Sequence, residues 1–169
     1  QIFSLNENLG KPKVEEAASR VAQVNEAVEV KTFHCRAGLQ NLPSMIKDCD
    51  LVIDCLDNLP SRFDLEKICS EMQITMIHGA IAGFLGQIAV VRPGRSMLIA
   101  IYGNISESSS DKGIETKLGN PAFTPAMLAS WQAGEAVKLL AGLDGVLEEN
   151  KLLIIDMLSG ESYQVELGL

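Results

Sequence analysis

The sequence is poor in aromatic residues, which make up 5% of its 169 positions. Hydrophobic residues nevertheless reach 47%, so we expect a core built mainly from Val, Ile, Leu, Ala and Met, as in α/β proteins. A chain of this length can bury such a core in one domain, which we expect to span residues 1–169.

Excess positive charge, CxxC pairs and long apolar runs are also missing. The formal net charge is -8, and Lys and Arg are scattered along the chain, which argues against nucleic acid as a partner. Because the four cysteines form no CxxC pair, we expect no zinc and a reducing, cytoplasmic location. No apolar run approaches the roughly 20 residues that cross a bilayer, and the polar start has no signal-peptide layout, so no membrane association is expected.

Apolar periodicity predicts the helices and strands. Helical spacing indicates helices at 13–24, 39–47, 60–72 and 121–142. Short apolar or alternating runs indicate strands at 28–33, 51–54, 74–80 and 86–93, followed by a hairpin of KLLIIDM and SYQVEL. We therefore expect part of a doubly wound, Rossmann-like α/β fold, with a mainly parallel sheet and antiparallel strands at the C-terminal end. The polar stretch 103–121 is expected to be a mobile loop.

The stretch DLVIDCLDN (50–58) carries the most chemical information. A buried strand brings Asp54 and Asp57 to its carboxyl end, where ligands bind in open α/β sheets. Asp57, followed by Asn58, could hold Mg²⁺ while the metal bridges phosphate oxygens, because hard cations prefer carboxylate oxygens. The residues alone leave a second interpretation open, in which Asp57 only caps the next helix.

Two basic residues are ambiguous by themselves. Lys13 opens a helix whose N-terminus favours anions, so it could meet a phosphate. A solvated surface lysine is the alternative. Arg62, one turn into the next helix, allows the same two interpretations.

Glycines and histidines in the second half are equally open. Gly79, Gly83 and Gly86 lie around the junction of two predicted strands, where glycines permit either tight turns or the close approach of a peptide tail. His34 and His78 have no partner at metal-ligand spacing, so both are interpreted as structural.

Four ordered blocks resemble the MoeB/ThiF/HesA adenylyltransferases. They are GKPKVEEA, LVIDCLDNLPSRF, HGAIAGFLGQIAVV, and PAFTPAMLASWQAGEAVKLLAG with LLIIDMLSGESYQVEL. The resemblance runs nearly end to end. It implies an enzyme that uses ATP and Mg²⁺ to adenylate the C-terminal glycine carboxylate of a ubiquitin-like sulfur carrier, with release of pyrophosphate.

The resemblance also implies roles for single residues at a nucleotide site. Lys13 would contact the phosphates, and Asp57 would bind Mg²⁺. Asn58 and Arg62 would help to hold the nucleotide. Lys13 and Asp57 would then act as electrostatic catalysts, because the carrier's own carboxylate attacks the α-phosphorus.

A second implied site receives the carrier. GFLGQ resembles the segment against which the extended tail of the carrier binds, which makes Gly83, Gly86 and Gln87 candidates for tail contacts. The resemblance further implies a homodimer. The nearly all-apolar helix at 123–141 is compatible with a buried interface, and an internal core helix fits equally well.

Parts of the family pattern are absent from this sequence. It has no GxGGxG turn with the following acidic residue for a ribose, and no cysteine at 103–121. We therefore expect this chain alone to be inactive and any covalent carrier intermediate to be absent. The alternatives are a non-catalytic binding or dimerisation module of the same fold, and a fragment of an unrelated nucleotide-binding protein such as a dehydrogenase.

Overall fold

The computed structural model describes residues 5–104 and 118–168. The chain divides into two compact units, Gln1–Ala37 and Gly38–Leu169, and each is described by itself. The expectation of a single domain stays a prediction. Most of the loop expected at 103–121 lies outside the described residues.

The first unit contains a short 3-10 helix, η1 (Asn6–Asn8), and the helix α1 (Lys13–Val24). α1 starts directly after Pro12. Because Pro12 has no N–H to donate to a carbonyl of a preceding turn, the helix does not extend further toward the N-terminus. Glu15 and Glu16 lie in its first turn, where negative charge suits the helix dipole. The helix predicted at 13–24 is confirmed.

The strand predicted at 28–33 is wrong, because this described segment forms no strand. Its apolar residues Val28, Val30 and Phe33 are between 42% and 48% exposed, and Phe33 lies three residues after Val30, out of step with the alternation of the two valines. Alternation shows which residues would share a face, but a strand forms only where a neighbour accepts its backbone hydrogen bonds.

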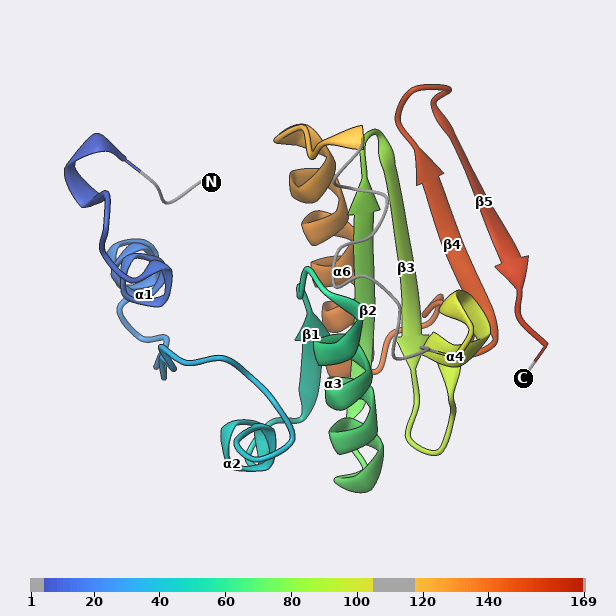
Figure 1. Cartoon of the computed structure of the whole chain (residues 1–169), viewed down its shortest axis with the longest axis horizontal. Coiled ribbons are helices and arrows are strands. Elements are labelled where there is room, and N and C mark those ends of the chain that lie inside the picture. The colour runs from blue at the N-terminus through green and yellow to red at the C-terminus, as the bar shows by residue number, and fades with distance from the viewer. Residues whose placement is uncertain (1–4, 105–117, 169) are drawn as a thin grey trace. The chain divides into compact units, whose positions relative to one another are not determined.

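The second unit is built on a five-stranded sheet whose strands follow chain order (Figure 1). The strands are β1 (Leu51–Asp54), β2 (Thr75–Ala82), β3 (Leu85–Val91), β4 (Lys151–Asp156) and β5 (Glu161–Glu166). β1 and β2 are parallel, and the three other pairs are antiparallel.

The predicted α/β class and the antiparallel C-terminal strands are confirmed. The expected parallel majority is not found among the described strands. Two of the antiparallel pairs, β2–β3 and β4–β5, are joined by turns that are too short for a parallel crossover. The missing strand at 28–33 removes a further candidate for parallel pairing.

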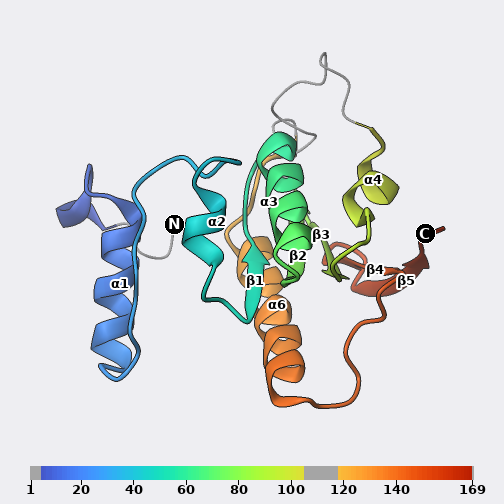
Figure 2. The same cartoon turned by 90° about the horizontal axis from the view of Figure 1, so that it is seen from below.

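Helices cover both faces of this sheet (Figure 2). The second unit contains α2 (Leu42–Ile46), α3 (Leu59–Glu71), α4 (Met97–Tyr102) and α6 (Phe123–Ala141). α6 packs on one face and α3 and α4 lie on the other. The helices predicted at 39–47, 60–72 and 121–142 are confirmed with shifted ends, whereas α4 was not predicted. Within the described residues, none of the helices has the length and apolarity that a membrane crossing requires.

The main core lies between α6 and the sheet. Ile77, Ile88 and Val90 are fully buried there against Leu128 of α6 and Leu153 of β4. Removing this much aliphatic surface from water stabilises the unit by roughly 1.5–3 kcal/mol per large side chain.

One polar side chain, Gln132, fastens α6 to the sheet. Its Nε2 donates to the carbonyl oxygens of Asp54 at 2.9 Å and Ile77 at 3.3 Å. The side chain lies directly over Gly79, where a Cβ atom would be 2.4 Å from Gln132 Nε2. Gly79 is therefore required for close packing rather than for a turn.

We predict that Gly79→Ala lowers the free energy of unfolding by about 1–3 kcal/mol, because the displaced Gln132 amide leaves buried carbonyl groups without partners. The matched control is Gly134→Ala in α6, where an added Cβ meets nothing within 4 Å. This control should stabilise the protein by about 0.5–1 kcal/mol through helix propensity. Urea denaturation measures both changes, and equal effects of the two variants would contradict the packing role of Gln132.

Candidate functional site

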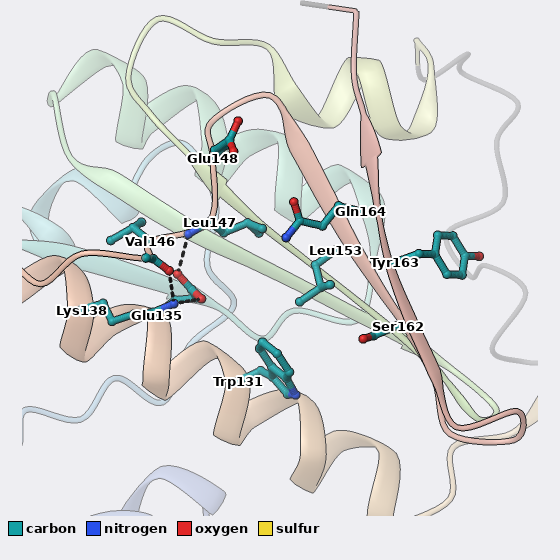
Figure 3. A pocket seen from close by; sticks show the side chains of 11 residues that line it. Trp131, Glu135, Lys138, Val146, Leu147, Glu148, Leu153, Ser162, Tyr163 and Gln164 are labelled. Atoms are coloured by element: carbon teal, nitrogen blue, oxygen red, sulfur yellow. Dashed lines mark hydrogen bonds and ion pairs between the residues drawn. The ribbon is translucent and has the colours of Figure 1, made fainter.

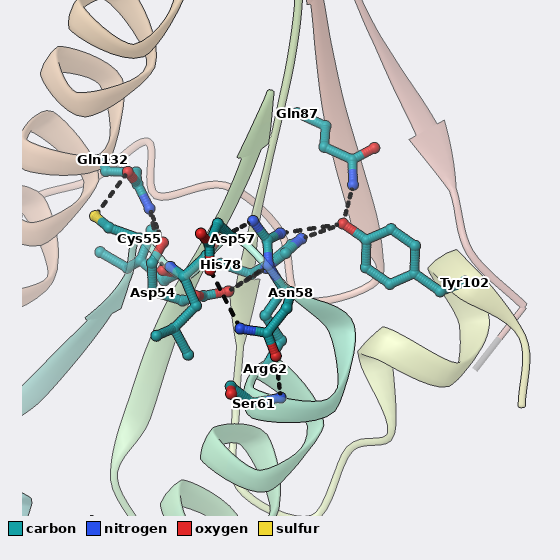
Figure 4. Close-up of polar contacts among 12 residues, drawn as sticks. Asp54, Cys55, Asp57, Asn58, Ser61, Arg62, His78, Gln87, Tyr102 and Gln132 are labelled. Atoms are coloured by element: carbon teal, nitrogen blue, oxygen red, sulfur yellow. Dashed lines mark hydrogen bonds and ion pairs between the residues drawn. The ribbon is translucent and has the colours of Figure 1, made fainter. Parts of the chain in front are cut away.

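The loop between β1 and α3 lies at the carboxyl end of β1 (Figure 4). Asn58 is the N-cap of α3, and its Oδ1 accepts a hydrogen bond from the backbone N–H of Ser61 at 3.0 Å. Asp57 is exposed, and its Oδ1 accepts a bond from Asn58 Nδ2 at 3.2 Å. The interpretation of Asp57 as the helix cap is therefore wrong, and its carboxylate faces solvent.

Asp54 behaves differently, because it is completely buried. Its Oδ1 accepts from the backbone N–H of Leu56 at 2.9 Å, and its Oδ2 lies 2.7 Å from His78 Nδ1. The guanidinium of Arg62 approaches the same oxygen at 4.0 Å. These contacts satisfy the buried carboxylate and hold the loop after β1 in place.

The contacts continue from His78 to the end of α4. His78 Nε2 lies 2.9 Å from the hydroxyl of Tyr102, and Gln87 Nε2 donates to the same hydroxyl at 2.5 Å. Burial lowers the pKa of His78, an effect that outweighs the opposite influence of Asp54. Burial also raises the pKa of Tyr102. Both rings are therefore neutral near pH 7.

Arg62 belongs to this buried group as well. Only 7% of the residue is exposed, and its guanidinium donates to the carbonyl oxygen of Leu56 and, at 3.4 Å, to the hydroxyl of Tyr102. The structure thus gives Arg62 a role in fastening the loop to α4. Its predicted contact with a nucleotide stays a prediction.

The glycines of the predicted tail site have local structural reasons. Gly83 forms the β2–β3 turn with a φ of +58°, and its N–H donates to the carbonyl oxygen of Gly119 at 2.9 Å. At Gly86 a Cβ would lie 3.1 Å from Cε of Met127, so α6 packs tightly on it. Gln87 points to the other face, toward Tyr102.

Lys13 is the first residue of α1 and belongs to the first unit. The other predicted site residues belong to the second unit, in which Asp57, Asn58 and Arg62 come together around the start of α3.

A separate hollow of about 490 Å³ lies between α6 and the β4–β5 hairpin (Figure 3). Trp131 lines it together with Glu135, whose carboxylate accepts bonds from Lys138 and from the backbone N–H of Leu147. None of the site residues predicted from the sequence lines this hollow. Among the described residues, no three His, Cys, Asp or Glu side chains gather in a way that could hold a metal ion.

Sequence reasoning missed the pairing of Asp54 with His78 and the roles of Tyr102 and Gln132. The first pair had a signal, because LVID and TMIH are aligned in parallel register and both end on a polar residue. Tyr102 had none, since α4 was not predicted.

We predict that replacing His78 by Gln changes the pH dependence of stability. Since burial lowers the pKa of His78 from 6.5, the unfolded chain binds the extra proton first. The stabilisation provided by neutral His78 is therefore complete above pH 6.5 and is lost as the pH falls through that value, by up to about 1.4 kcal/mol per pH unit.

The measurement is urea denaturation of both proteins roughly one pH unit above and one below that value. The difference between wild type and variant isolates His78 from Glu66, whose pKa is raised by burial and whose contribution has the opposite sign. Parallel pH profiles of the two proteins would refute a neutral, buried His78.

Known proteins are similar to this chain in sequence and in fold. The sequence model of one family, described as the ThiF family, matches residues 1–168. The SAMP-activating enzyme E1 of Haloferax volcanii is 30% identical over 156 residues, which cover 92% of this chain and 57% of that protein. The molybdopterin-synthase adenylyltransferase of Escherichia coli is 26% identical over 172 residues, which cover 99% of this chain and 66% of that protein.

Solved structures give the same fold. A crystal structure of Escherichia coli MccB with ATP matches with a TM-score of 0.74 at 15% identity, over 99% of this chain and 52% of that one. PaaA matches with a TM-score of 0.71 at 18% identity, over 99% of this chain and 51% of that one. The chain thus spans little more than half the length of these structures.

Proposed function

Because the chain belongs to the ThiF family, we propose that it forms the carrier-facing part of an ATP-dependent adenylyltransferase, which activates the C-terminal carboxylate of a ubiquitin-like sulfur-carrier protein. The names of its relatives in Haloferax volcanii and Escherichia coli support this activity. The single observation in this chain that carries the proposal is the exposed carboxylate of Asp57 at the carboxyl end of β1.

The proposed reaction needs no side-chain nucleophile. An oxygen of the carrier carboxylate forms a bond with the α-phosphorus of ATP, while the bond from that phosphorus to the pyrophosphate oxygen breaks. The Asp57 carboxylate would hold Mg²⁺, which would neutralise charge on the phosphates when bound; this ion usually takes one or two carboxylates, waters and substrate phosphates as ligands. Asp57 offers one solvent-facing carboxylate, which suits an ion that keeps several of its waters.

Three other residues are each proposed to contact the nucleotide. Lys13, at the N-terminus of α1, would contact phosphate, since the helix dipole and the ammonium group both favour an anion. Asn58 and Arg62 would hold the nucleotide beside Asp57. Asn58 also caps α3, and Arg62 also donates to the carbonyl oxygen of Leu56.

The carrier would approach along Gly83, Gly86 and Gln87. Gly83 and Gly86 are buried, with α6 packed on Gly86. Of the three, Gln87 is therefore the residue that offers a partly exposed polar side chain to an extended tail, on the other face of the sheet. The proposed location is the cytoplasm, as expected for a sequence whose four cysteines form no CxxC pair.

We predict that Asp57→Asn lowers ATP–pyrophosphate exchange at least about 100-fold, as expected when a charge that stabilises the reacting phosphates is lost. The assay uses the natural protein that contains this sequence. Asp50→Asn, an exposed residue before the other end of β1, is the matched control. Equal activity of the Asp57 variant and this control would remove Asp57 from the mechanism.

A dimerisation module is the second candidate, and α6 favours it. Val137 and Leu140 on this helix are 59% and 63% exposed, although apolar side chains are usually covered when they lie close together on a helix. A second copy of the chain is the proposed cover.

We predict that Leu140→Glu converts the dimer to a monomer, because a carboxylate would be buried without a partner in the interface. Light scattering measures the mass. Leu158→Glu is the control, since Leu158 is 75% exposed in the β4–β5 turn and should leave the dimer intact. A wild-type protein that is already monomeric would reject the interface.

A further inference from the structure

The hydroxyl of Tyr102 accepts a hydrogen bond from Gln87, which is one of the candidates for contacts with the carrier tail. We propose that Tyr102 is a positioning residue that holds the Gln87 amide with its carbonyl oxygen outward, where that oxygen accepts a hydrogen bond from a backbone N–H of the bound tail. This inference rests on the proposed function, and it adds the group that Gln87 recognises and the residue that orients it.

The direction of each hydrogen bond follows from the buried end of the network. Asp54 is acceptor-only as a carboxylate, so the Nδ1 of His78, 2.7 Å away, must carry a proton. The ring is neutral, because burial lowers its pKa. Its Nε2 therefore has no proton and can only accept a hydrogen bond.

The hydroxyl of Tyr102 is then fully used. Its one proton goes to His78 Nε2, 2.9 Å away, so its oxygen can only accept from other groups. Arg62 NH1 donates to it at 3.4 Å and Gln87 Nε2 donates to it at 2.5 Å. The two donors, Arg62 and Gln87, thus match the two lone pairs of the Tyr102 oxygen.

The orientation of the Gln87 amide follows from this match. A flipped amide would bring Oε1 against the Tyr102 oxygen, which has no proton left to give, and would forfeit one hydrogen bond. With Nε2 held by Tyr102, Oε1 points away from the network (Figure 4). Gln87 is only half-buried in β3, so a ligand can reach this oxygen.

A carbonyl acceptor discriminates between the parts of the proposed substrates. It binds an N–H group, which an extended peptide supplies along its backbone. It offers nothing to phosphate or to a terminal carboxylate, which are acceptors themselves. Gln87 thus recognises a backbone N–H of the tail, whereas the reacting carboxylate belongs to the Asp57 end of the site.

The test compares a short synthetic peptide that ends in glycine with ester analogues, in each of which one backbone N–H is replaced by oxygen. Calorimetry measures their binding to wild type, Tyr102→Phe and Gln87→Met, and to Tyr163→Phe as the control. Tyr163 is the other tyrosine of the chain and is 51% exposed. Denaturation of each variant verifies folding, and Gln87→Met keeps the test valid if Tyr102→Phe does not fold.

We expect one ester analogue to bind roughly tenfold more weakly than its amide to wild type and to the control, which corresponds to about 1.4 kcal/mol. The same replacement should change binding less than about twofold in the Tyr102 and Gln87 variants, because the acceptor is misoriented or gone. Peptide binding without this coupling overturns the present inference alone. If no peptide binds, the proposed tail site fails as well.

A measurement without peptide separates these two failures. The ¹⁵N chemical shifts of the His78 ring should show a proton on Nδ1 and none on Nε2. A proton on Nε2 would reverse the hydrogen bond from Tyr102 and would overturn the orientation of Gln87, whatever the peptides do.

Discussion

The second unit depends on one constraint, the burial of the Asp54 carboxylate at the end of β1. A buried carboxylate is costly unless several groups satisfy it. Here the backbone N–H of Leu56, the ring of His78 and the guanidinium of Arg62 supply those groups. Because they come from the next loop, the next strand and the next helix, satisfying one side chain fixes the geometry of all three.

This constraint also explains why neighbouring polar residues have separate roles. Asp54 faces inward and holds the loop through the N–H of Leu56, and Asn58 caps α3. Asp57, between them, is left with its carboxylate in solvent. The proposed cation site at Asp57 therefore has a structural residue on either side of its carboxylate.

The sequence predicted much of the fold and less of the site. Periodicity located α1, α3, α6 and the C-terminal hairpin, because each of them carries a regular pattern of apolar residues. It failed at 28–33, where strand formation depends on a neighbour that no local pattern reveals. It also missed α4, which is short and is held by contacts distant in sequence, including the bond from the N–H of Leu98 to Glu66.

The site residues divide in the same way. Asp57 and Asn58 could be found because they follow a strand directly. The partners of Tyr102 lie 15 to 40 residues away in sequence, and Gln132 is 78 residues from Asp54. Only the three-dimensional pairing of strands and helices brings these groups together.

We propose that Asp57 marks a cation and nucleotide site at the carboxyl end of β1. In the natural protein that contains this sequence, Mn²⁺ can replace Mg²⁺ and broaden the NMR signals of nearby backbone amides. With ATP present, the account predicts the strongest broadening at Asp57, Asn58 and the first turn of α3. Broadening centred elsewhere, or unchanged by Asp57→Asn, would contradict it.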